Sequence, residues 1–282
     1  MIRNPHSGLT KYSIYVRLQF QSMLNDFVMS NEIYNYNQLC SEIYYPGSRI
    51  GVLLIHSLSG TPHRLEFLAK ALERANFTVL APCLSGHGTD PANLMKTHYS
   101  HWLEEVKESI ARLKAICEKV YIIGDSLGGG LGMVASLSNP VAGIVTMSTP
   151  VFYRRHIIWN MVFKTAGKVM EYYVKKESGY KSYQKVPVRI IKEAYDFTNH
   201  DLRDAISKIN VPMMVVQGKK DRIVHPRSAK YIFNNIATDK KELIWVNEGE
   251  HSLATGSDKE KVFEEIINFI NRQVKNTNGK AH

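Results

Sequence analysis

The sequence predicts an α/β protein whose mostly parallel central sheet is covered by helices on both faces. Short runs of nearly uninterrupted apolar residues recur along the chain, as is typical of strands that are buried on both faces. Amphipathic stretches with helical spacing separate these runs, and glycine-containing loops follow several of them. This alternation is the order expected of strand–helix–strand units, in which successive strands run parallel.

The first half of the chain contains three apolar runs and two amphipathic stretches. Residues 49–55 (RIGVLLI), 78–81 and 120–123 predict buried strands. Residues 64–75 and 101–117 space their apolar side chains three and four positions apart, which predicts helices with one buried face.

The same alternation returns in the second half. Residues 143–147 (GIVTM), 213–217 (MMVVQ) and 243–246 predict three more strands. Residues 226–236 and 258–274 predict helices, the second with a long apolar face. The chain therefore contains enough strands and helices for one sheet with two helical layers.

The amino-acid composition indicates a globular protein, and the cysteine content indicates a reducing environment. The 282 residues are 44% apolar and 22% charged, which is ample for a buried core. Cys40, Cys83 and Cys117 share no metal-ligand spacing and leave one cysteine unpaired, so we expect no disulfide framework and a reducing compartment. Polar residues interrupt every apolar stretch near the N-terminus, and no run approaches the about 20 apolar residues of a membrane span. We therefore expect no signal peptide and a cytoplasmic location.

The positive charge of the chain is concentrated in one segment. The net charge is +10, and residues 152–192 hold ten Lys or Arg against two Glu. A nucleic-acid-binding protein would spread its basic residues over a recognition surface. We therefore predict no nucleic-acid partner.

The stretch VYIIGDSLGGGLG, residues 120–132, carries the strongest chemical signal. Its G-x-S-x-G pattern places Ser126 between Gly124 and Gly128, directly after a predicted strand and before a helix. Small residues on both sides allow the backbone to turn sharply, which exposes the serine hydroxyl at the tip of the turn. Ser126 is therefore the predicted nucleophile.

A serine hydroxyl becomes a nucleophile only when a base accepts its proton. In a strand–serine–helix arrangement the partners follow in the order Asp or Glu and then His, each after a later strand. Asp221 follows the strand at 213–217, and His251 follows the strand at 243–246, both in glycine-containing loops. These two residues are the predicted partners. The other candidates are weaker. Asp196, Asp201, Asp204 and His225 are expected to be surface, helix-capping or structural residues, and His200 has no assignable role. His87, His98 and His101 follow the second strand and could line a pocket, but no second set of ligands at metal spacing accompanies them.

A serine hydrolase also needs two N–H donors for the oxyanion that forms during the reaction. The residue after the nucleophile supplies one, so Leu127 is the first predicted donor. The second comes from the loop after the first strand, residues 53–63, in which position favours Leu58.

These motifs resemble those of the α/β-hydrolase superfamily, and more narrowly the small bacterial carboxylesterases that include thermostable monoacylglycerol lipases. The resemblance extends from about Ser41 to Ile270. It rests on the stretches HSLSGTPH, APCLSGHG, GDSLGG, GIVTMSTP, VVQGKKDRIVHPRSA and the GEH loop. Three features depart from the family pattern. His56-Ser57 stands where His-Gly is usual, Glu250 separates Gly249 from His251, and residues 1 to about 40 have no counterpart in the core pattern.

The resemblance implies hydrolysis of short to medium acyl esters, with monoacylglycerols among the candidates, and no metal or organic cofactor. An acyl-enzyme would form on Ser126, with His251 as general base and then acid, and Asp221 would orient its imidazole. A thioesterase or acyltransferase would use the same triad. A protein that only binds ligands on a hydrolase scaffold is the third alternative, and it typically lacks a triad member. Stereoselectivity and oligomeric state stay open.

The resemblance also predicts the domain organisation. The hydrolase core would comprise residues 41–151 and 208–276, with a helical cap inserted at 152–207 and a tail at 277–282. Residues 1–40 form an extension of unassigned role, and Met29 is an alternative start. The basic and aromatic residues of the cap either pack on the core with their charges solvated or contact anionic lipid surfaces. Binding to anionic but not neutral vesicles would support lipid contact.

Overall fold

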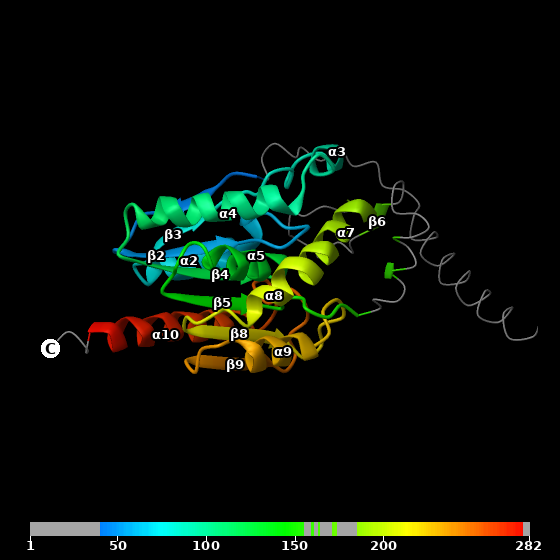
Figure 1. The fold of residues 1–282 in the computed structure, drawn as a ribbon. Coiled ribbons are helices and arrows are strands. Elements are labelled where there is room, and N and C mark those ends of the chain that lie inside the picture. The colour runs from blue at the N-terminus through cyan, green and yellow to red at the C-terminus, as the bar shows by residue number, and fades with distance from the viewer. Residues whose placement is uncertain (1–39, 155–158, 161–162, 164–170, 174–184, 279–282) are drawn as a thin grey trace, which may run out of the picture. The chain divides into compact units, whose positions relative to one another are not determined.

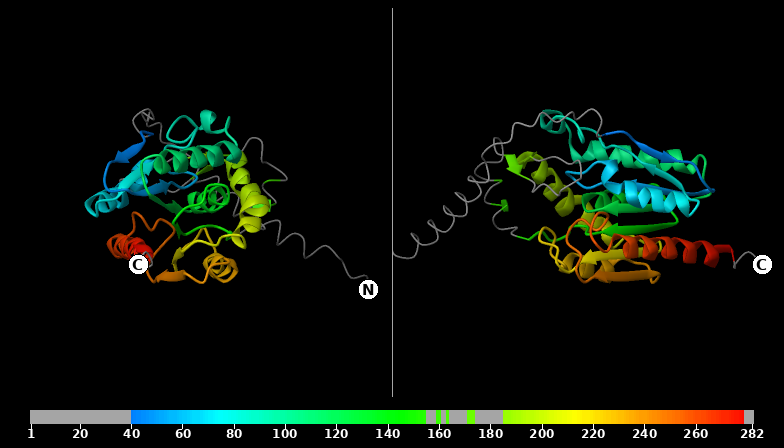
Figure 2. Two further views of the ribbon diagram at one scale, coloured as in Figure 1. Left: turned by 60° about the vertical axis from the view of Figure 1, so that its left-hand side comes forward. Right: turned by 180° about the vertical axis from the view of Figure 1, so that it is seen from behind.

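Parallel strands form the centre of the protein (Figures 1 and 2). The computed structural model describes residues 40–154, 159–160, 163, 171–173 and 185–278. Within them, one seven-stranded sheet has the order β1-β3-β2-β4-β5-β8-β9, and only β1 runs antiparallel to its neighbour. In that order the strands are Ile43–Tyr45, Thr78–Ala81, Ile50–Ile55, Lys119–Asp125, Gly143–Met147, Met213–Gly218 and Lys241–Val246.

Helices cover both faces of this sheet, as the sequence predicts (Figure 2). The apolar sides of α2 (Glu66–Arg74) and α10 (Lys259–Asn278) pack into one core layer. The opposite layer contains α4 (Tyr99–Lys114), α5 (Leu127–Ser136) and α9 (Arg227–Asn235). Strands β3, β5 and β8 are buried along their whole length, which explains why they appear in the sequence as continuous apolar runs.

The strand register brings the ends of the central strands to one edge of the sheet. Ile55, the last residue of β2, lies opposite Gly124 near the end of β4. Met147, the last residue of β5, lies opposite Asp125 of β4 and Val216 of β8. Since all these strands run parallel, the loops that follow them meet at the same edge.

Several short elements go beyond the sequence prediction. They are the edge strand β1, the 3₁₀ turn η2 (Pro62–Leu65), α3 (Pro91–Leu94), the hairpin β6 (Glu171–Tyr173) and β7 (Lys185–Pro187), α7 (Val188–Phe197), the π-helical turn η3 (Thr198–Leu202) and α8 (Arg203–Ile206). The last five fall in the region predicted as a cap. The extension before residue 40, much of residues 155–184 and the end of the tail lie outside the described residues, so the predicted domain boundaries stay predictions.

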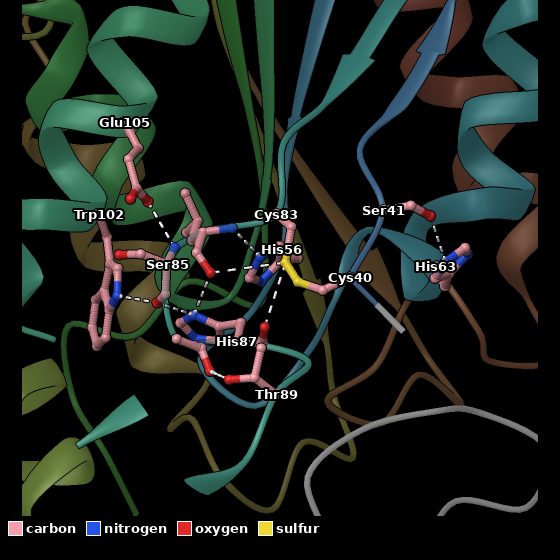
Figure 3. The surroundings of a disulfide bond; sticks show 12 residues. Cys40, Ser41, His56, His63, Cys83, Ser85, His87, Thr89, Trp102 and Glu105 are labelled. Atoms are coloured by element: carbon pink, nitrogen blue, oxygen red, sulfur yellow. Dashed lines mark hydrogen bonds between the residues drawn. A yellow bond between two sulfur atoms is a disulfide. The ribbon is translucent and has the colours of Figure 1, made fainter. Parts of the chain in front are cut away.

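The prediction that the chain forms no disulfide is wrong. Cys40 and Cys83 are bonded, with their Cα atoms 5.5 Å apart, a separation typical of disulfides (Figure 3). The antiparallel pairing of Ile43 with Ala81 brings the two segments together, because the chain just before β1 then runs alongside the chain just after β3. Cys117 is a free, buried thiol. The argument from cysteines for a reducing compartment therefore fails, and the cytoplasmic location stays a prediction.

The described residues contain neither a membrane-spanning helix nor a cluster of metal ligands. Every helix in these residues is too short or too polar to cross a bilayer. Within the same part of the chain, no three His, Cys, Asp or Glu side chains gather as metal ligands.

Candidate active site

Ser126 occupies a sharp turn between β4 and α5. Its φ of 53° and ψ of −116° are unusual for a residue with a side chain, and neighbouring contacts hold the turn in place. The N–H of Ser126 donates to Met147 O at 2.7 Å, and Thr149 Oγ1 donates to Ser126 O at 3.0 Å. A Cβ on Gly124 would overlap the backbone nitrogen of Gly129, so glycine is needed where β4 and α5 approach each other.

Asp221 is fully buried in the loop after β8. Its Oδ1 accepts the backbone N–H groups of Ile223 and Val224, at 2.8 and 2.9 Å. Its Oδ2 accepts from Gln217 Nε2 at 3.0 Å and from His251 Nδ1 at 2.9 Å. Four donors therefore fix both oxygens of the carboxylate and leave it one orientation.

His251 connects the carboxylate to the serine. While Nδ1 donates to Asp221, Nε2 lies 3.1 Å from Ser126 Oγ. With its proton on Nδ1, the imidazole presents a free lone pair to the serine hydroxyl. The structure thus brings together all three side chains that the sequence proposes as a triad.

Burial and charge act in opposite directions on this pair. Burial disfavours the imidazolium, but the Asp221 carboxylate outweighs it and raises the pKa of His251 above the usual 6.5. Burial also opposes ionisation of Asp221, yet His251 and the two backbone N–H groups keep its pKa below the ordinary value. Asp221 is therefore ionised at neutral pH, and His251 is a stronger base than a free histidine.

The two predicted N–H donors lie in the loops beside Ser126. Leu127 is the first residue of α5, where the helix itself supplies no acceptor for the N–H. Leu58 lies in the loop that follows β2. Among the described residues, neither N–H donates a hydrogen bond to another protein group. Ser57 keeps a negative φ, so its replacement of the usual glycine introduces no strain here.

The competing histidines and aspartates do not join this cluster. His225 Nδ1 accepts the N–H of Arg227 at the start of α9, and His98 accepts the N–H of Ser100 at the start of α4. Asp196 forms an ion pair with Lys192 on α7. These positions are structural, as the sequence predicts for His225 and Asp196.

Sequence reasoning missed the residues that support the cluster. Gln217, the fifth residue of β8, donates to Asp221, although it reads in the sequence only as the polar end of an apolar run. His56 and His87 are each 1% exposed and hold the loops after β2 and β3. Their contacts could not be foreseen, because they depend on how two loops from distant parts of the chain meet.

Known proteins resemble this chain along most of its length. A family model for the alpha/beta hydrolase fold matches residues 51–180, and one described as serine aminopeptidase, S33, matches residues 180–258. A carboxylesterase of Bacillus subtilis (strain 168) is 27% identical over 234 residues, which are 81% of this chain and 95% of the relative. A thermostable monoacylglycerol lipase of Bacillus sp. (strain H-257) is 27% identical over 235 residues, 80% of this chain and 92% of the relative.

Solved structures agree with these relatives. A structure reported with the metagenome-derived lipolytic enzymes LipS and LipT has a TM-score of 0.77 and 28% identity, and the match covers 83% of this chain and 98% of that one. The sheet order, the strand–serine–helix turn and the two family models agree with the resemblance drawn from the sequence. The chain therefore has the α/β-hydrolase fold, and it is an enzyme similar to carboxylesterases and monoacylglycerol lipases.

Proposed function

We propose that the protein hydrolyses carboxylic esters of short to medium acyl chains through an acyl-enzyme on Ser126. The observation that carries the proposal is the continuous chain of hydrogen bonds from Asp221 through His251 to Ser126, at 2.9 and 3.1 Å. Similarity to a carboxylesterase and a monoacylglycerol lipase supports the same class of substrate.

In the first half-reaction, Ser126 Oγ attacks the acyl carbon while His251 Nε2 accepts the hydroxyl proton. The carbonyl oxygen becomes an oxyanion, which the N–H groups of Leu58 and Leu127 stabilise. The tetrahedral intermediate collapses, and the alcohol leaves with the proton from His251. Water then attacks the acyl-enzyme with His251 again as base, which releases the carboxylic acid and restores Ser126.

Asp221 makes His251 effective in both halves. It holds the proton on Nδ1, so that Nε2 stays free to accept, and it stabilises the imidazolium that forms. The raised pKa of His251 agrees with this role, because the stabilised charge is the one present in the transition state. No metal or organic cofactor takes part in these steps.

A panel of p-nitrophenyl esters with increasing acyl length, measured beside acyl-CoA, tests the proposal. We expect the highest kcat/KM on esters of short to medium chains and its loss in Ser126→Ala. Faster turnover of acyl-CoA would instead identify a thioesterase or acyltransferase with the same triad. A folded protein that hydrolyses neither class would favour the ligand-binding alternative.

A further inference from the structure

Two buried histidines connect the loop after β2 with the loop after β3 (Figure 3). His56 extends from the first loop, and its Nε2 accepts the N–H of Leu84 at 3.1 Å. His87 extends in the opposite direction, and its Nε2 lies 2.7 Å from the carbonyl oxygen of Leu58. The two rings meet edge to face with centroids 4.8 Å apart. The loop that carries the predicted oxyanion donor is thus held from both sides.

These contacts restrain both peptide planes that flank the Cα of Leu58. On one side, Ser57 O accepts from His56 Nδ1 and from the N–H of Gly60, both at 2.9 Å. The C=O and N–H of a trans peptide point in opposite directions, so these bonds set the direction of the Leu58 N–H. On the other side, His87 holds the carbonyl of Leu58 itself. A rotation of the Leu58 N–H would break at least one of these bonds.

The ring of His87 has one proton, and geometry assigns it to Nε2. Both ring nitrogens face carbonyl oxygens, which can only accept, but Nε2 lies 2.7 Å from Leu58 O whereas Nδ1 lies 3.2 and 3.3 Å from Leu84 O and Ser85 O. The much shorter contact is the one that the single proton occupies. Burial lowers the pKa of His87 to about 4, so the ring is neutral at neutral pH. Trp102 lies against the ring, with centroids 5.2 Å apart, and donates from Nε1 to Ser85 O at 3.1 Å. The donor of His87 therefore has a fixed direction.

We propose that His87 is a positioning residue for the oxyanion hole, which sets the Leu58 N–H through the Leu58 carbonyl. This inference rests on the proposed function. An oxyanion donor acts only when it is aimed in advance at the place where negative charge develops. Loss of the His87 contact should therefore impair the chemical step more than the binding of the ester.

Two amide variants separate positioning from packing. In His87→Gln the side-chain NH₂ can reach the place of Nε2, whereas in His87→Asn it ends near the place of Nδ1. We expect His87→Asn to lower kcat by about 10- to 100-fold, which is at most about the effect of removing one oxyanion donor. KM should stay within about threefold of the wild-type value. His87→Gln should keep kcat within about threefold of the wild type, since it retains the donor.

Ser109→Ala is the matched control, because it removes a buried hydrogen bond within α4, from Ser109 Oγ to Glu105 O at 2.7 Å, and lies in neither of the two loops. It should lower the melting temperature and leave kcat within about threefold of the wild type. Equal kcat values in the Gln and Asn variants, or an effect on KM alone, would overturn the positioning role. Failure of the proposed function is seen separately, as wild-type protein whose ester hydrolysis does not depend on Ser126.

Discussion

Replacement of Asp221 by asparagine tests how the buried carboxylate controls His251. Backbone N–H groups of Ile223 and Val224 donate to Oδ1 at 2.8 and 2.9 Å, and only an oxygen can accept them. In the Asp221→Asn variant, the amide oxygen should therefore take the place of Oδ1. The amide NH₂ group then replaces Oδ2, which in the wild type lies 2.9 Å from His251 Nδ1.

The exchanged group reverses the hydrogen bond to His251. The new NH₂ donates to Nδ1, so the ring proton moves to Nε2 and points at Ser126 Oγ, 3.1 Å away. In that tautomer His251 has no free lone pair for the serine proton. Gln217 can adapt in part, since a flip of its amide turns the buried Oε1, which has no hydrogen-bond partner in the described structure, toward the new donor. The flip gives up one hydrogen bond, from Gln217 Nε2 to Gly218 O at 3.1 Å.

The expected loss is therefore catalytic rather than structural. Removal of the correct tautomer in a serine triad lowers kcat by about 10⁴-fold, equivalent to roughly 5.4 kcal/mol of transition-state stabilisation. KM should change by less than about threefold, because Asp221 is buried behind His251 and does not reach the substrate. The melting temperature should fall only slightly.

Steady-state hydrolysis of one p-nitrophenyl ester measures this effect, with circular dichroism to verify folding. Asp239→Asn is a matched control, since Asp239 is exposed in the turn between α9 and β9. It should retain wild-type kcat. A folded Asp221→Asn enzyme with kcat within about tenfold of the wild type would refute the role of Asp221 in setting the tautomer.

Three further predictions concern pH, the turn and the disulfide. His251 must be neutral to act as base, and its pKa is raised. As the pH is lowered, kcat/KM should therefore fall to half at a pH above 6.5, and a half-point below 6.5 would contradict this. Gly124→Ala should lower the free energy of unfolding, measured with urea, by at least about 1–3 kcal/mol, the usual cost of overpacking, since its Cβ would overlap the backbone of Gly129. An unchanged free energy of unfolding would contradict the close approach. Cys40→Ser should destabilise the oxidised protein by up to about 4 kcal/mol, as expected for a disulfide between residues 43 apart in the sequence. Cys117→Ser is the control, because it leaves the disulfide intact. Three free thiols in the unfolded wild type would contradict the disulfide.

The sheet, and the meeting of Ser126, Asp221 and His251 at one edge of it, can be predicted from the sequence because both depend on local patterns. Buried parallel strands are continuous apolar runs, so β2, β3, β5 and β8 are recognisable from composition alone. Ser126 follows β4, Asp221 follows β8 and His251 follows the half-buried edge strand β9. Since parallel strands end at one edge, their order along the chain is enough to predict that they meet.

Other features depend on contacts that no local pattern records. Strand β1 has three residues, of which only Ile43 is buried, so its apolar signal is too short to identify a strand. Without β1 and its antiparallel register, nothing in the spacing of Cys40 and Cys83 predicts a disulfide. The pairing of His87 with Leu58 depends in the same way on how two loops cross.

The proposed mechanism has two parts: Ser126 is the nucleophile, and His251 activates it. Labelling with a fluorophosphonate, followed by mass spectrometry of the digested protein, tests both parts directly. We predict one adduct, on the peptide that contains Ser126, with no labelling in Ser126→Ala and much slower labelling in His251→Asn. An adduct on another residue, or labelling of Ser126 at the same rate without His251, would contradict this mechanism.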